Sequence, residues 1–134
     1  MQLREFNPND YEMVCKWWEA HGSERLPMEM LPKLGIVVCK DEEPMAALWL
    51  YMDNSVGVCF MERVVTKPKL KLTEARDAVL FGIGFLKQRA AAMDYGAMFI
   101  RTYPALAKYL KRIGFVSDPR PVECLFSLTR GANA

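Results

Sequence analysis

A β-branched strand that passes almost directly into a long helix constrains the fold of this chain more than any other feature. The run Val64-Val65-Thr66 stops at Pro68, where a strand cannot continue in a regular ladder. The apolar residues that follow recur at helical spacing up to about residue 93, on a face formed by Ala75, Val79, Ile83, Leu86 and Ala90. A strand that meets a helix N-terminus brings free backbone N–H groups and the helix dipole together, and this junction therefore predicts an anion site.

Apolar runs before this junction predict three strands, at 36–40, 45–51 and 56–66, which are separated by short polar turns. Such tight connections favour an antiparallel meander. We expect the remaining elements to be a strand at 3–6, a helix between the cap Asn7 and Gly22, a short helical turn within 23–33, a strand at 97–102, a helix at 104–113 and a last strand at 123–129. This order predicts an α+β domain with mixed strand pairing.

Composition and charge exclude several classes of protein. At 134 residues the chain is predicted to be one domain, 1–134. A formal net charge of +2 argues against nucleic-acid binding, and the longest apolar runs are too short to span a membrane. Four widely spaced cysteines and a single histidine predict no metal site. Buried, reduced cysteines and a polar N-terminal segment without the features of a signal peptide predict a soluble, cytoplasmic protein.

Three lysines alternate along the junction between strand and helix. In an extended segment Lys67, Lys69 and Lys71 would share one face, and Leu70 and Leu72 would point toward the core. Three cations beside a helix N-terminus predict a site for a diphosphate. The alternative is a solvated basic edge that discourages strand pairing.

Local signals predict how this helix begins and packs. Thr73 is a suitable N-cap residue. Gly82 and Gly84 lie inside the helix, where each costs about 1 kcal/mol relative to alanine. We expect these glycines to allow another part of the backbone to approach closely.

Adjacent tryptophans in the first helix predict a second surface feature. Trp17 and Trp18 are not expected to face the core together, so one should be exposed. With Met28, Met30 and Leu31 it would line an apolar groove for an acceptor or a protein partner.

The whole-chain element order resembles that of the GNAT (Gcn5-related N-acetyltransferase) superfamily, in which a long helix follows the third strand of a meander. The best local match is 104–115, a helix that ends in the pair Gly114-Phe115. The resemblance implies a GNAT-like mixed central sheet flanked by helices, β-α-α-β-β-β-α-β-α-β, and acetyl-CoA as the cofactor.

In that family a loop of pattern Q/R-x-x-G-x-G/A opens the central helix and holds the pyrophosphate. Aligning Pro68 with the proline of the family's V-x-P places Lys71 at the Q/R position, and Glu74 and Arg76 at the two glycines. Side chains at these positions crowd a phosphate, and Glu74 adds an unfavourable charge. The cofactor-binding residues that the resemblance implies are Val64, Thr66, Lys67, Lys69, Lys71 and Thr73.

The resemblance also implies two catalytic groups. Many GNAT enzymes carry a tyrosine four residues before the glycine of Gly-Phe, where it protonates the thiolate of CoA. Here that position is Leu110, and the candidate acid Tyr109 lies one residue earlier, about 100° away around the helix. Glu62, in the strand that lines the acetyl end of the cofactor in the family, is the candidate general base. The alternative is a structural ion pair for Glu62 and an ordinary half-buried aromatic for Tyr109.

Three functions remain open at this point. The first is an acetyl-CoA-dependent N-acetyltransferase whose acceptor is a small-molecule or peptide amine. The second is a catalytically silent GNAT-fold binding or structural protein, similar to small phage-encoded GNAT-like proteins and then located in the virion. The third is an unrelated α+β domain that shares only the element order.

Overall fold

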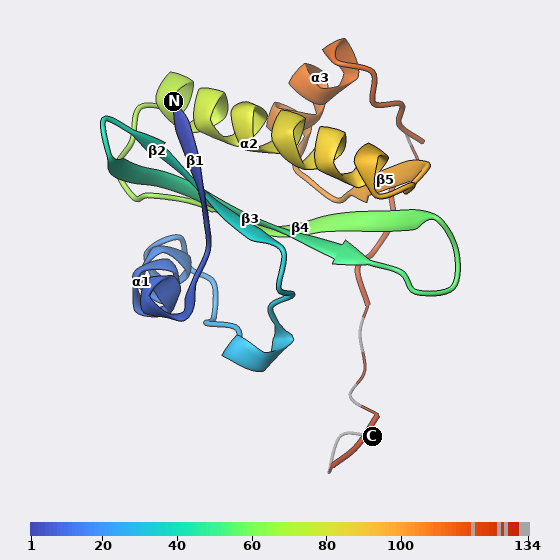
Figure 1. Ribbon diagram of the computed structural model, residues 1–134, viewed down its shortest axis with the longest axis horizontal. Coiled ribbons are helices and arrows are strands. Elements are labelled where there is room, and N and C mark those ends of the chain that lie inside the picture. Colours follow the sequence, from blue (N-terminus) through green and yellow to red (C-terminus); the bar gives the residue numbers. More distant parts are fainter. Residues whose placement is uncertain (119, 126, 128, 132–134) are drawn as a thin grey trace.

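Five strands form one sheet in the order β1-β2-β3-β4-β5, with helices on both faces (Figure 1). The computed structural model describes residues 1–118, 120–125, 127 and 129–131. The strands are β1 (Gln2–Glu5), β2 (Gly35–Lys40), β3 (Glu43–Met52), β4 (Val58–Thr66) and β5 (Ala97–Ile100). The helices are α1 (Tyr11–Ala20), α2 (Leu72–Ala92) and α3 (Pro104–Arg112), with short 3-10 turns η1 (Pro8–Asp10) and η2 (Met28–Met30).

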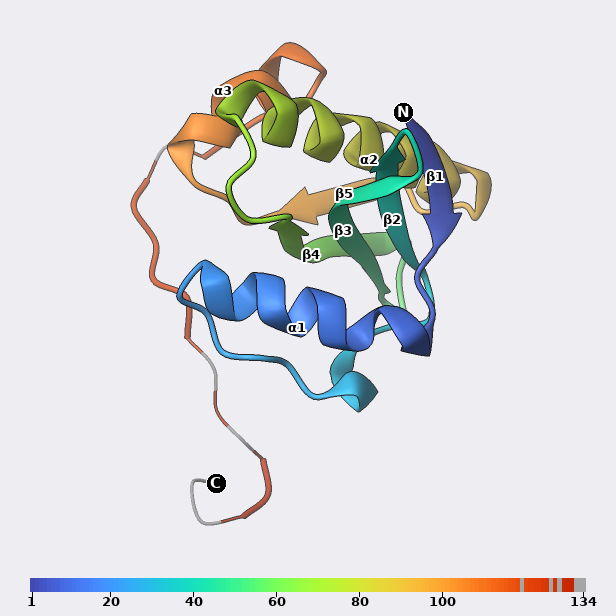
Figure 2. The same ribbon diagram turned by 90° about the vertical axis from the view of Figure 1, so that its left-hand side faces the viewer.

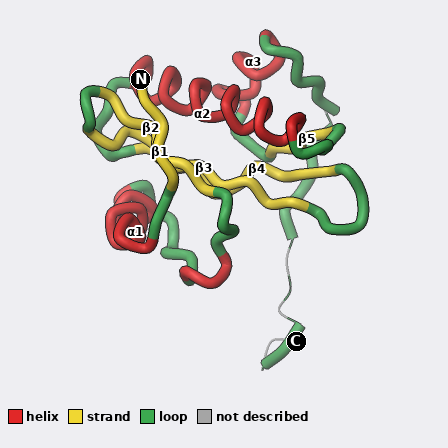
Figure 3. Tube along the Cα trace, viewed as in Figure 1, coloured by secondary structure: helices red, strands yellow, loops and turns green. Residues whose placement is uncertain are grey.

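The predicted meander is confirmed, because β2, β3 and β4 pair antiparallel in sequence order (Figure 3). The turn between β2 and β3 places Asp41 and Glu42 at positive φ, which suits a tight hairpin. β1 adds antiparallel to β2, and β5 adds parallel to β4 after the crossover through α2. The sheet is therefore mixed and the domain is α+β, as predicted.

Helices α1 and α2 lie on opposite faces of the sheet (Figure 2), and each face carries its own hydrophobic core. α2 packs on one face, where Leu48, Met61, Ile83 and Leu86 are fully buried. α1 packs on the other face against Trp49. Trp17 and Trp18 are both buried in this second core, so the prediction that one of them is exposed is wrong. The ten-residue helix α1 packs closely enough on the sheet to bury two adjacent side chains. The predicted apolar groove therefore has no exposed tryptophan to line it.

The helix start before α1 follows its sequence signal closely. The Asn7 side chain accepts from the Asn9 N–H at 2.9 Å, and the Asp10 carboxylate accepts from the Asn7 N–H at 3.0 Å. This is a capping box. Arg4 of β1 donates two hydrogen bonds to the same carboxylate, at 2.7 and 2.8 Å, and so ties the first strand to the helix start.

The start of α2 differs from the expectation in three ways. The helix begins at Leu72, so its N-cap is Lys71, and Thr73 lies inside the first turn rather than at the cap. Leu72 is 89% exposed, while Leu70 packs against the core. Neither glycine admits another part of the backbone as predicted: a Cβ at Gly82 would meet the side-chain atom Leu48 Cδ1 at 2.7 Å, and Gly84 faces open space.

The C-terminal part of the chain differs most from the expectation. Among the described residues of the predicted last strand, 123–125, 127 and 129, none is in a strand, and 126 and 128 lie outside the described residues. Cys124 is exposed, whereas Cys15, Cys39 and Cys59 are buried as predicted. Among the described residues, no helix is both long and apolar enough to cross a membrane.

Candidate functional site

β4 and β5 separate where their pairing ends, and a hollow opens there. Their last paired residues are Met61 and Ile100. Beyond them β4 continues to Thr66, while the chain leaves β5 toward α3. A hollow of about 390 Å³ lies at this point, lined by Phe60, Glu62, Phe99, Ile100 and Arg101.

A β-bulge lies in β4 next to this separation. Ala47 pairs with Val65 and Trp49 pairs with Glu62, so Arg63 and Val64 together face the single residue Leu48. Arg63 has a positive φ of 63°. Such a bulge leaves part of the backbone unpaired and redirects the strand. Of the predicted cofactor-binding residues, Val64 therefore lies in the bulge, and Thr66 ends the strand, where its carbonyl contacts His21 Nε2 at 2.9 Å.

Glu62 lines the hollow and forms an ion pair. Arg101 donates to Glu62 Oε1 through Nε at 2.9 Å and through a second guanidinium nitrogen. The pair joins β4 to the segment after β5 across the separation.

The first turn of α2 lies at the junction between β4 and α2, and no side chain caps it. The first backbone hydrogen bond joins the Ala75 N–H to the Lys71 carbonyl, at 3.0 Å. The N–H groups of Leu72, Thr73 and Glu74 have no acceptor among the described residues. Free donors at the positive end of a 21-residue helix are suited to an anion.

The three lysines of the junction do not share one face. Lys69 has a positive φ of 68° in a turn, so the segment is not extended and the predicted alternation is wrong. The physical reason is Pro68, which starts a turn and not a continued strand. Lys67 is held in an ion pair by Glu43 at the start of β3, while Lys69 and Lys71 are exposed.

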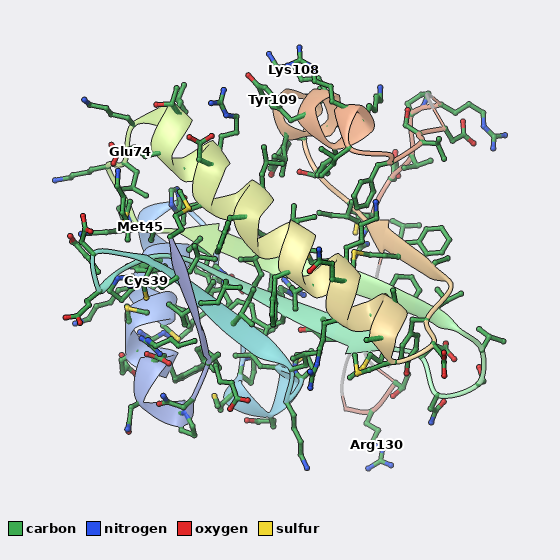
Figure 4. The ribbon with its side chains drawn as sticks, turned by 45° about the horizontal axis from the view of Figure 1, so that its top comes forward. Cys39, Met45, Glu74, Lys108, Tyr109 and Arg130 are labelled. Carbon is green, nitrogen blue, oxygen red and sulfur yellow. The ribbon has the colours of Figure 1, made fainter. Side chains whose placement is uncertain are left out.

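Arg76 joins α2 to α3 through Tyr109. It donates to the Tyr109 hydroxyl at 3.2 Å, and its guanidinium lies 4.9 Å from the centre of the ring. Lys108 and Arg112 lie 5.0 and 5.2 Å from the same centre. The Arg76 hydrogen bond, followed by the positive charge of Lys108, lowers the pKa of Tyr109 below its ordinary value. Figure 4 shows Tyr109 and Lys108 on α3, and Glu74 at the start of α2.

The predicted site residues therefore fall into separate groups. Glu62 lies on the face of the sheet opposite α2, because the neighbouring Met61 packs under α2. Tyr109 lies on the α2 side and contacts Arg76. The hollow at the separation of β4 and β5 lies beside Glu62.

Two arginines of this site were not among the predicted site residues. The sequence presents Arg76 only as a side chain that replaces a glycine, and its contact with Tyr109 of α3 depends on how the two helices pack. Arg101 lies within the predicted strand at 97–102 and directly after the observed β5, but its contact with Glu62 depends on the parallel register between β4 and β5. A parallel strand pair that follows a helix crossover is the one signal that could have suggested the second contact.

Comparison with solved structures finds close matches in fold at low sequence identity. A putative acetyltransferase from Agrobacterium tumefaciens is 17% identical, covering 94% of this chain and all of that chain, with a TM-score of 0.63. The aminoglycoside N-acetyltransferase AAC(6')-Iy in complex with CoA is 15% identical over 95% of this chain and 100% of that chain, with a TM-score of 0.62.

An aminoglycoside acetyltransferase from an uncultured soil metagenomic sample, in complex with sisomicin, is 9% identical over 96% of each chain, with a TM-score of 0.67. No protein-family model and no curated protein sequence matches the chain. At these identities the solved structures establish a shared fold.

Proposed function

We propose that this chain, which has the fold of the GNAT acetyltransferases, binds acetyl-CoA and catalyses acetyl transfer to an amine. The observation that carries the proposal is the separation of β4 and β5 beside Glu62, close to a helix whose first N–H groups have no acceptor. In this proposal the separation of the strands would receive the acetyl end of acetyl-CoA, and the start of α2 would receive its phosphates. The shared fold with a protein solved in complex with CoA supports the same assignment.

The residues present fit the phosphates of acetyl-CoA in a way that does not need the glycine loop. The free N–H groups of Leu72, Thr73 and Glu74 would donate to the diphosphate, and the exposed ammonium groups of Lys69 and Lys71 would balance its charge. Lys67 is held in an ion pair by Glu43 and would contribute less to balancing the charge of the diphosphate. Backbone groups of Val64 and Thr66 would hold the part of acetyl-CoA that lies between β4 and β5.

Bound acetyl-CoA supplies an acetyl group activated as a thioester. Glu62 would accept the proton of the attacking amine, directly or through a water molecule, and Arg101 holds its carboxylate toward the hollow. Tyr109 carries a proton on Oη whose pKa is lowered by Arg76, which suits a donor to a thiolate leaving group. The hollow beside Phe60 and Phe99 would receive the apolar part of the acceptor amine.

A specific observation also favours a second candidate, a GNAT-fold protein without catalysis. Glu74 and Arg76 occupy the positions of the two glycines, and the Arg76–Tyr109 contact already bridges α2 and α3. A protein that no longer turns over acetyl-CoA would keep the fold and such stabilising contacts.

Cofactor binding is the first test. Saturating acetyl-CoA, at about a hundred times its Kd, should stabilise the fold by about 2.7 kcal/mol and raise Tm by several degrees. The double variant Lys69→Glu, Lys71→Glu should lose most of that shift. Lys16→Glu makes the same charge reversal on α1, which packs on the face of the sheet opposite α2, and this variant should keep the shift in Tm. No shift with the unmodified protein at high acetyl-CoA would reject the acetyltransferase and favour the second candidate.

Catalysis is the second test. Release of free CoA thiol is followed with a panel of amines that includes polyamines, peptides and aminoglycosides. Glu62→Gln should lower kcat about 100-fold or more, because a general base is typically responsible for that factor. The acetyl-CoA thermal shift should persist in this variant. Full activity of Glu62→Gln would show that Glu62 has only a structural role, in its ion pair with Arg101.

A further inference from the structure

The hollow beside the separation of β4 and β5 brings an ion pair and two aromatic rings together. Glu62 and Arg101 line it, and so do Phe60 and Phe99. Its volume of about 390 Å³ lies at the small end of the range of ligand pockets, which is about 300–1,000 Å³. A site of this size and composition suits a small molecule that has both polar and apolar parts.

The ion pair leaves polar atoms of both partners available. Both hydrogen bonds that Arg101 donates to Glu62 end on Oε1, so Oε2 accepts none from the part of the chain that the structure describes. The other terminal nitrogen of Arg101 contacts Cys124 Sγ, and a guanidinium carries more N–H donors than these contacts use. The Arg101 side chain is also 61% exposed. A ligand in the hollow can therefore meet a carboxylate oxygen and guanidinium N–H groups at the same time.

The two rings give the hollow a flat apolar wall. Phe60 and Phe99 are paired across β4 and β5, and their rings stack with centres 5.7 Å apart. Phe60 is 39% exposed and Phe99 is 56% exposed. Helix α1 packs on the same face of the sheet against Trp49. Exposed rings of this kind offer an aromatic group of a ligand a surface on which to stack.

The charges of the hollow favour one class of amine. An amine without a negative group would be attracted to Glu62 and repelled by Arg101. A molecule with a carboxylate beside its ammonium group matches both side chains, because the ammonium can lie at Glu62 and the carboxylate can accept a forked contact from the guanidinium. Such a zwitterion is the group that every free α-amino acid carries.

We propose that the acceptor is a free α-amino acid with an aromatic side chain. Its carboxylate binds Arg101, and its amine lies at the Glu62 carboxylate. Its ring packs on Phe60 and Phe99. This assignment of an acceptor rests on the proposed acetyl transfer.

The reaction forms a bond between the amine nitrogen and the carbonyl carbon of the thioester and breaks the bond between that carbon and sulfur. The ammonium group of the amino acid gives up two protons in total. One ends on the sulfur of CoA, and the other leaves through Glu62 to water. The products are an N-acetyl amino acid and free CoA.

Direct binding tests the class of ligand without catalysis. In isothermal titration calorimetry, L-phenylalanine should bind saturably to the protein, either alone or saturated with CoA. Phenethylamine lacks the carboxylate, 3-phenylpropionate lacks the amine and L-alanine lacks the ring, so each should bind at least about tenfold more weakly. Binding of phenethylamine as tight as that of L-phenylalanine would overturn the proposal. So would the failure of L-phenylalanine, L-tyrosine and L-tryptophan to bind to either form.

Arg101→Met tests the contact with the carboxylate. The preference for L-phenylalanine over phenethylamine, measured as the ratio of their Kd values, should fall at least about tenfold. Both ligands are measured on the same variant, so a change in stability or at Glu62 affects both. Arg89→Met removes an exposed arginine of α2, on the opposite face of the sheet, and should keep the ratio. An unchanged ratio in Arg101→Met would overturn the assignment.

Turnover separates this inference from the proposed function. Formation of N-acetyl-L-phenylalanine, detected by mass spectrometry, would support both. Release of CoA with polyamines, peptides or aminoglycosides, but not with aromatic amino acids, would overturn the assignment of the acceptor and leave the acetyltransferase standing. Binding of L-phenylalanine by a protein that acetyl-CoA does not stabilise would reject the acetyl transfer and keep the hollow as a binding site for an aromatic amino acid.

Discussion

At the scale of single residues, Tyr109 shows how a few cations set the chemistry of one group. Arg76 reaches its hydroxyl from α2, and Lys108 and Arg112 lie against its ring from α3. Positive charge beside a phenol stabilises the phenolate, so the pKa of Tyr109 is lowered. This effect exists in the free protein, whatever the function of the residue.

We therefore expect Arg76→Met to raise the pKa of Tyr109 toward that of an ordinary tyrosine, because the largest cause of the lowering is removed. Ultraviolet titration of tyrosinate measures the change, with the Tyr109→Phe spectrum subtracted to isolate this ring. Lys16→Met on α1 is the matched control and should leave the titration unchanged. An equal pKa in Arg76→Met and the unmodified protein would contradict the assignment.

At the scale of elements, α2 carries two glycines that differ in what surrounds them. Gly82 lies over β2 and β3, where a Cβ would stand 2.7 Å from Leu48 Cδ1 and 3.1 Å from Val38 Cγ2. Gly84, two residues later, has nothing within 4 Å of an added Cβ. The first glycine sets the distance between helix and sheet, and the second only weakens the helix.

The two alanine variants should thus change stability in opposite directions. Gly84→Ala should raise the free energy of unfolding by about 0.5–1 kcal/mol, because alanine restricts the unfolded chain and favours a helix. Gly82→Ala should lower it, since overpacking typically costs about 1–3 kcal/mol and exceeds that gain. Urea denaturation of both variants compares them directly. Stabilisation by both would mean that the helix can move away from Leu48 freely.

At the scale of the whole molecule, the first strand is joined to the first helix by a charged contact. Arg4 holds the Asp10 carboxylate, which also caps the helix start, and Asp10 is nearly buried. The Arg4 hydrogen bonds lower the pKa of Asp10 below its ordinary value. A carboxyl whose pKa is lower in the folded state contributes stability above its unfolded pKa, near 3.9, and loses it as the pH falls through the folded value.

Asp10→Asn should accordingly lower the free energy of unfolding by about 1–3 kcal/mol at neutral pH, as for other charge-assisted hydrogen bonds. Its difference from the unmodified protein should shrink as the pH falls below the unfolded carboxyl pKa. Denaturant titrations across that acidic range measure this. Asp41→Asn, at an exposed hairpin turn that tolerates asparagine, is the control and should show no such pH dependence. A constant difference at all pH values would exclude the Arg4–Asp10 charge as the cause.

The sequence by itself determined the elements and most of their order. The capping box at Asn7, the turns of the meander and the helical spacing after Pro68 act over a few residues, so their signals are readable without a structure. The same is true of Glu62 as a carboxylate in an apolar strand.

Only the tertiary structure decided which side chains meet. Glu62 faces Arg101 because β5 pairs with β4 in one register, and Tyr109 meets Arg76 because α3 packs beside α2. The burial of both tryptophans also depends on contacts between distant segments. Such contacts follow from packing across the whole chain, whereas propensity and periodicity describe only neighbouring residues.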